Sequence, residues 1–166
     1  MRGNRRLSPH FTLGQLMEVN VEHRGRTLPA QDTPGQAVVC HLELLCECYL
    51  EPLYQTGEEP RLRCAYLSKR LNDYLGERED DWHTRGSAVD IYCDGLPHAI
   101  RLFNIIHKRF LYEGVGFDEL FIYIRGRTTW LHVSYDCCCD PRRVKDNQNS
   151  LRYGIFKYNQ RMRHYE

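Results

Sequence analysis

Two histidines and one aspartate have the types and spacing best suited to chemistry in this chain. His83 and Asp90 stand seven residues apart in His83-Thr-Arg-Gly-Ser-Ala-Val-Asp90, and His132 follows in the segment Trp-Leu-His-Val-Ser. Gly86 allows the loop that precedes Asp90 to fold back, so that His83 can meet Asp90. Two imidazoles and one carboxylate offer donors for a tetrahedral zinc ion whose fourth position stays open to water, as in hydrolytic sites.

These residues also fit a plainer interpretation, because a histidine and an aspartate often occur together by chance and can be ordinary hydrogen-bonded polar residues.

A second candidate for a metal or redox tract is Cys137-Cys138-Cys139. Adjacent strand residues point to opposite faces, so three consecutive thiols cannot reach one ion from regular structure. We therefore expect a structural or incidental role for this tract, and eight free thiols in a reducing cytosol.

Helices and strands must alternate to position the candidate ligands. Apolar periodicity predicts helices over 13–19, 33–54, 68–75 and 97–110, strands over 61–67 and 87–93, and a hairpin of 120–124 with 129–135. Thr33 is the expected N-cap of the long helix. The expected inner stripe of the last helix is Ile100, Phe103, Ile106 and Phe110. This order predicts the α+β class, a single compact domain with helices packed on an antiparallel sheet.

Composition and charge exclude several classes of protein. The 166 residues are 42% hydrophobic and 27% charged, as in soluble globular domains. No apolar run approaches the roughly 20 residues of a membrane-spanning helix, so we expect no membrane insertion. The net charge of +1 gives no global signal for nucleic acid. We expect a domain over residues 1–140 and a basic tail over 141–166, partly helical or disordered, whose aromatic residues leave nucleic-acid binding as a minor alternative.

The two ligand segments together resemble a known enzyme family. His83 to Asp90 matches the His-x-x-Gly-x-Ala-x-Asp core of the zinc D-Ala-D-Ala carboxypeptidases and related peptidoglycan peptidases. The segment around His132 is similar to the second signature of a small, single-domain branch often found in phages and prophages. Further segments resemble the family in the same order, over about residues 7–136: 7–13, 48–53, 66–72 and 117–121.

This resemblance implies a hedgehog/DD-peptidase-like zinc peptidase fold, with Zn²⁺ bound by His83, Asp90 and His132. It implies hydrolysis of peptide bonds in peptidoglycan stem peptides, as a D-Ala-D-Ala carboxypeptidase or an endopeptidase that degrades the cell wall. The basic N-terminus lacks an apolar stretch, so we expect synthesis in the cytoplasm without a Sec signal. Such a protein would act on the wall after lysis or be carried in a virion.

The chain departs from the family's pattern at four positions: Asp81 for a serine, Thr129 and Tyr123 for acidic residues, and Leu67 for an arginine. Three cations lie near the missing arginine in sequence, namely Arg63, Lys69 and Arg70. These departures keep open an alternative, a zinc-retaining degenerate relative with a wall-binding or structural role and little or no catalysis.

Hairpin geometry offers a replacement for the missing acid. A two-residue turn at Gly126-Arg127 would pair Tyr123 with Trp130. The period of two then places Glu119 and Tyr123 on the face of His132, whereas a three-residue turn would place them on the other face. Glu119 is then the candidate general base and Tyr123 a candidate hydrogen-bond donor to the oxyanion. Alternatively, Glu119 is an ordinary solvated strand residue, and Tyr123 only packs against its neighbours.

Overall fold

The computed structural model describes residues 5–21, 25, 27–136, 141–143 and 152–158. Within these residues five strands form one open sheet in the order β1-β2-β4-β3-β5. The strands are β1 (Arg61–Cys64), β2 (Ala88–Cys93), β3 (Glu119–Arg125), β4 (Thr128–Ser134) and β5 (Arg152–Tyr158). The first four pair antiparallel, but β5 runs parallel to β3. The predicted α+β class is confirmed, whereas the sheet is mixed and not purely antiparallel.

The helical elements are α1 (Leu13–Met17), α2 (Gln36–Leu45), η2 (Cys46–Leu50), α3 (Glu51–Gln55), α4 (Lys69–Leu75), η3 (Trp82–Arg85), α5 (Gly95–Glu113) and η4 (Pro141–Arg143). Side-chain caps explain where two of these helices begin, because Thr12 caps the N-terminus of α1 and Ser68 caps that of α4. The predicted cap at Thr33 is wrong, since α2 begins at Gln36 behind Gly35. Among the described helices, none combines the length and apolarity needed to cross a bilayer.

The long helix runs through α2, η2 and α3 in spite of a proline. Pro52 has no N–H, so it cannot donate the regular α-helical hydrogen bond to the carbonyl of Cys48, four residues earlier. The π-turn η2 lies at this place, and the guanidinium of Arg109 on α5 donates to the Cys48 oxygen at 2.9 Å. The break is therefore repaired by a neighbouring helix, and the predicted helix to about Tyr54 is confirmed.

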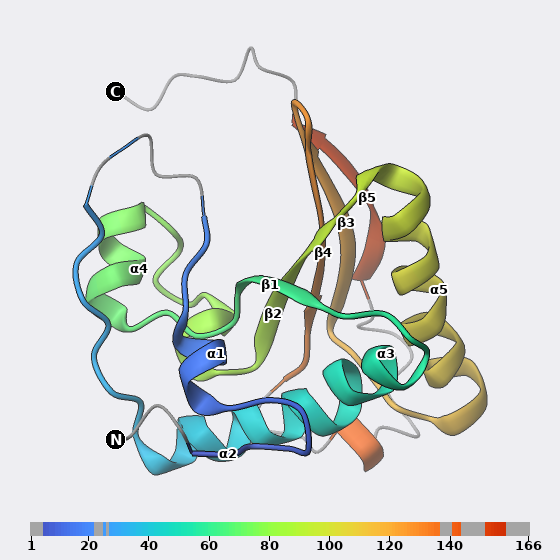
Figure 1. Ribbon diagram of the computed structural model, residues 1–166, viewed down its shortest axis with the longest axis horizontal. Coiled ribbons are helices and arrows are strands. Elements are labelled where there is room, and N and C mark those ends of the chain that lie inside the picture. Colours follow the sequence, from blue (N-terminus) through green and yellow to red (C-terminus); the bar gives the residue numbers. More distant parts are fainter. Residues whose placement is uncertain (1–4, 22–24, 26, 137–140, 144–151, 159–166) are drawn as a thin grey trace.

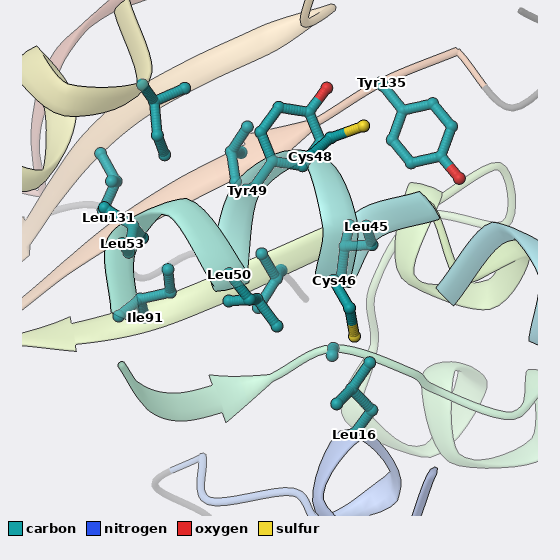
Figure 2. Packing of buried hydrophobic residues seen from close by; sticks show 14 of the residues in the cluster. Leu16, Leu45, Cys46, Cys48, Tyr49, Leu50, Leu53, Ile91, Leu131 and Tyr135 are labelled. Carbon is teal, nitrogen blue, oxygen red and sulfur yellow. The ribbon is translucent and has the colours of Figure 1, made fainter. Parts of the chain in front are cut away.

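One face of the sheet packs on the helices. Alternate sheet residues such as Val89, Ile91 and Leu131 are fully buried in one cluster with residues of the long helix. Figure 2 shows Leu50 and Leu53 of that helix in this cluster. Helix α5 covers the sheet on one side, and α4 lies on the other side (Figure 1).

Three of the four residues predicted for the inner stripe of α5 pack against the core: Ile106 is buried, and Phe103 and Phe110 are partly buried against the same cluster. Ala99, Leu102 and Ile106 are its buried residues, whereas Ile100 is 40% exposed. The buried set follows the i, i+3, i+7 spacing of a helix face. The prediction was therefore wrong for Ile100, and it missed Ala99 and Leu102.

Strand β5 overturns the expectation of a helical or disordered tail for residues 152–158. Its register places Arg152 opposite Glu119 and Phe156 opposite Tyr123. On its other face Tyr153 packs edge-on against Phe117 of the loop after α5. The predicted tail therefore contributes an edge strand to the sheet, and two of its side chains lie on the same face as the hairpin residues Glu119 and Tyr123.

Candidate metal centre

The hairpin register decides which strand residues share a face. Tyr123 pairs with Trp130 and Phe121 with His132, across a two-residue turn in which Gly126 has a φ of 59°. The predicted register is confirmed. Glu119, Tyr123 and His132 therefore lie on the face of the sheet opposite the helical core.

His83 is held from both ends of the short helix η3. The Asp81 carboxylate caps this helix by accepting from the backbone N–H of His83 at 2.7 Å. Gly86 ends it in the left-handed conformation, with a φ of 70°. The Nδ1 atom of His83 donates to the carbonyl of Ala65 at 2.9 Å, and this fixes the tautomer so that in the neutral ring Nε2 presents a lone pair.

Asp90 stands between the two histidines, and its contact with His83 is the one that the spacing of the motif predicted. Its Oδ1 lies 3.6 Å from Nε2 of His83 and 2.7 Å from Nδ1 of His132. Its other oxygen accepts a hydrogen bond from Nη1 of Arg63 at 2.9 Å. The three central residues are only 6%, 6% and 8% exposed, so this polar cluster is buried.

This cluster could hold a metal ion. Ligand atoms of His83, Asp90 and His132 all lie within 4.8 Å of one another. Ligands of a tetrahedral zinc ion stand about 3.3 Å apart, given bonds of roughly 2.0–2.1 Å, and the two measured separations of 3.6 and 2.7 Å lie on either side of that value. The buried Nε2 of His132 has no hydrogen-bond partner among the described residues and faces the Glu119 carboxylate at 3.3 Å, so Nδ1 is the atom that lies toward Asp90.

The charges in the cluster depend on one another. Burial opposes ionisation of Asp90, but His83 and the hydrogen bond from His132 hold its pKa well below the ordinary value. Burial alone would lower the pKa of His83, whereas Cys64 and Asp90 raise it well above the usual range. Burial would lower the pKa of His132, but its hydrogen bond to Asp90 and the neighbouring Glu119 carboxylate raise it. Protons therefore occupy the imidazoles readily, and a metal ion would have to displace them.

The cluster opens into a pocket of about 410 Å³. Leu67, which replaces the family's arginine, lines this pocket but is buried with Cys64 and Leu71 in a small apolar cluster. Of the three cations near it in sequence, Arg63 alone reaches the pocket, where it also stacks on Trp130 at 4.5 Å. Lys69 and Arg70 instead pair with acidic residues on the surface.

The two predicted catalytic residues both line the pocket. Oε2 of Glu119 lies 3.3 Å from Nε2 of His132, a charge contact whose alignment falls short of a hydrogen bond. The neighbouring His132 outweighs burial and, together with Arg152, lowers the pKa of Glu119, so this carboxylate is ionised. Tyr123 is stacked between Trp130 and Phe156, at ring-centroid distances of 5.3 and 5.4 Å.

Two further positions had been compared with the family's pattern. Asp81 serves as the helix cap described above. Thr129 lies three residues before His132 on the same strand, so it points to the opposite face and is buried there. It cannot reach the pocket as a base would. The Cys137–Cys139 tract lies outside the described residues.

Arg152 and Glu77 are among the charged residues of the pocket that sequence reasoning missed. Arg152 comes from β5, which a basic tail gave no reason to expect, and it forms an ion pair with Glu119. Glu77, in the turn after α4, lines the same pocket, and burial raises its pKa. Glu77 opens the charged run Glu-Arg-Glu-Asp-Asp in the sequence, but only the fold shows that this segment lines the pocket.

Comparisons with protein-family models, with curated proteins and with solved structures find no match for this chain. The residues of the site must therefore support any functional conclusion. They establish a buried His–Asp–His group that could hold a metal ion, beside a pocket with ionised carboxylate and guanidinium groups.

Proposed function

We propose that the protein is a zinc-dependent metallopeptidase that hydrolyses peptide bonds in peptidoglycan stem peptides. The observation that carries this proposal is the convergence of His83, Asp90 and His132, from three separate elements, on one buried point beside a pocket. Two nitrogen donors and one carboxylate are the ligand set of hydrolytic zinc sites. The spacing of the three residues supports the D-Ala-D-Ala carboxypeptidase and endopeptidase family in particular.

The chain's own side chains would divide the work around the metal. When bound, a zinc ion polarises the scissile carbonyl and activates water. Glu119 is ionised and lines the pocket, so it is the proposed proton acceptor. The phenol of Tyr123 and the guanidinium of Arg63 also line the pocket and are the proposed donors to the developing oxyanion.

Hydrolysis of purified peptidoglycan by zinc-loaded protein tests this proposal. Mass spectrometry of the released peptides would identify the bond that is cleaved. We expect release by the wild type and none by His132→Ala, with His98→Ala as the control, because His98 pairs with Glu58 at a distance from the pocket. A wild type that binds zinc but releases no peptide, D-alanine or cross-link product would overturn the peptidase assignment.

Two observations favour a second candidate, a zinc-retaining relative that binds the wall or plays a structural part. Leu67 is buried among apolar side chains, and the aromatic stack around Tyr123 fills the position where close relatives of the branch carry a glutamate. If these are true losses, Tyr123→Glu should raise hydrolysis from near zero. Under the leading proposal the same change removes an oxyanion donor and gives no such gain.

A further inference from the structure

A row of charged side chains crosses the sheet, one from each strand and in the spatial order of the strands. It runs from Arg63 on β1 through Asp90 on β2, His132 on β4 and Glu119 on β3 to Arg152 on β5. The first three contacts measure 2.9, 2.7 and 3.3 Å. The fourth is the ion pair between Glu119 and Arg152.

Each candidate ligand in this arrangement has a partner on its outer side. His83 donates its Nδ1 proton to the Ala65 carbonyl, and Asp90 receives Arg63 on its outer oxygen. For His132, the nitrogen away from Asp90 faces the Glu119 carboxylate. A carbonyl or carboxylate at that place orients a ligating imidazole, and its removal typically costs about 10- to 100-fold in metal affinity.

Glu119 itself is held by the edge strand. The parallel register sets Arg152 directly opposite Glu119, and the backbone N–H of Arg152 donates to the Asp118 carbonyl at 2.9 Å. Its guanidinium pairs with Oε1 of Glu119, which leaves Oε2 toward His132. The Glu119 side chain is 17% exposed and that of Arg152 59%, so the pair spans the site and its rim.

We infer that Arg152 is a positioning residue of the metal centre, which acts through Glu119 on His132 and makes strand β5 part of the site. The inference rests on the metal centre proposed above but not on peptidase activity. An arginine suits this role because its planar fork fixes the orientation of a carboxylate, which a flexible lysine does less well.

Zinc affinity, measured by competition with a chromogenic chelator, tests the inference in the full-length protein. Arg152→Ala should bind zinc about tenfold more weakly, at the lower end of the range for outer partners. Arg152→Lys should recover part of this loss because it keeps the charge. Arg101→Ala is the matched control, since Arg101 forms an exposed ion pair with Glu58 on the opposite side of the sheet and should leave zinc affinity unchanged.

A double-mutant cycle separates positioning from general damage to the fold. If Arg152 acts through Glu119, Arg152→Ala should have no further effect in a Glu119→Ala background, because coupled residues are not additive. An equal loss in both backgrounds, or an unchanged affinity in Arg152→Ala, would overturn the inference. A wild type that binds zinc without hydrolysing any wall substrate leaves these outcomes readable, whereas a wild type that binds no zinc overturns the inference together with the metal centre.

Discussion

Gly86 is the position where one added methyl group should do the most damage to the site. A Cβ built on Gly86 would lie 2.8 Å from the carbonyl oxygen of Val38, 2.9 Å from its Cγ1 and 3.0 Å from Cγ of Leu42. The left-handed φ of 70° adds strain of about 1–2 kcal/mol for any L-residue. Overpacking against helix α2 adds about 1–3 kcal/mol. Gly86→Ala should therefore lower the free energy of unfolding by about 2–5 kcal/mol.

Gly114 provides a matched control for this prediction. It ends α5 with a φ of 72° and a ψ of 20°, the same ψ and nearly the same φ as Gly86, but a Cβ there would meet nothing within 4 Å. Gly114→Ala should cost only the backbone strain, about 1–2 kcal/mol. In a protein of this size each kcal/mol corresponds to roughly 2–4 °C in Tm. Urea denaturation of both variants in the presence of a chelator measures the difference.

Zinc binding gives the second readout for the same pair. Because Gly86 ends the helix that carries His83, relief of the contact with Val38 must shift that helix, so Gly86→Ala should also weaken zinc binding. Gly114→Ala should not. Equal destabilisation by the two variants would show that η3 does not approach α2 as closely as described, and would refute this explanation of the glycine in the motif.

Three other predictions concern separate parts of the molecule. Glu119→Gln should cut turnover at least ~10²-fold, because a general base is lost, while zinc content in excess zinc stays at one per chain; unchanged turnover would remove Glu119 from catalysis. Burial opposes ionisation of Glu51, but hydrogen bonds from Ser8 and His10 lower its pKa, so its stabilising contribution should be complete above the unfolded value of about 4.3 and be lost as the pH falls through the lower folded pKa. Denaturation of Glu51→Gln between pH 3 and 7 should show less of this acid loss than the wild type, and an identical pH profile would contradict the assignment. Titration of freshly prepared, denatured protein should find eight thiols, in line with the free thiols of Cys40, Cys46, Cys48, Cys64 and Cys93; fewer than about five would indicate disulfides.

Local signals predicted the elements that carry the candidate ligands. The glycine between His83 and Asp90 indicated the fold-back of the loop, and a two-residue turn was enough to set the register that places Glu119 and Tyr123 beside His132. These features depend on residues close in sequence. The helix predicted at 68–75 was likewise confirmed as α4.

The missed features depend on distant pairings. Strand β5 pairs in parallel with β3, whose Glu119 lies opposite Arg152 and about thirty positions earlier in the chain. No turn or local alternation in the sequence therefore predicted this strand. At the π-turn, the guanidinium of Arg109 on α5 donates to the Cys48 carbonyl, a contact between residues 61 positions apart. The position of Glu77 at the pocket depends on how α4 docks on the sheet. Residues of this kind, Arg152 and Glu77 among them, could not be assigned to the site before the fold was known.

Zinc content of the purified protein tests the central claim most directly. Metal analysis of the wild type should find about one zinc per chain, and His83→Ala and His132→Ala should each lose stoichiometric zinc, because His83 and His132 provide two of the three converging donors. The wild type should also unfold at a higher temperature with zinc than without it, since a ligand of the native state stabilises that state. Undiminished zinc in both variants would contradict the assignment and place the metal elsewhere in the chain.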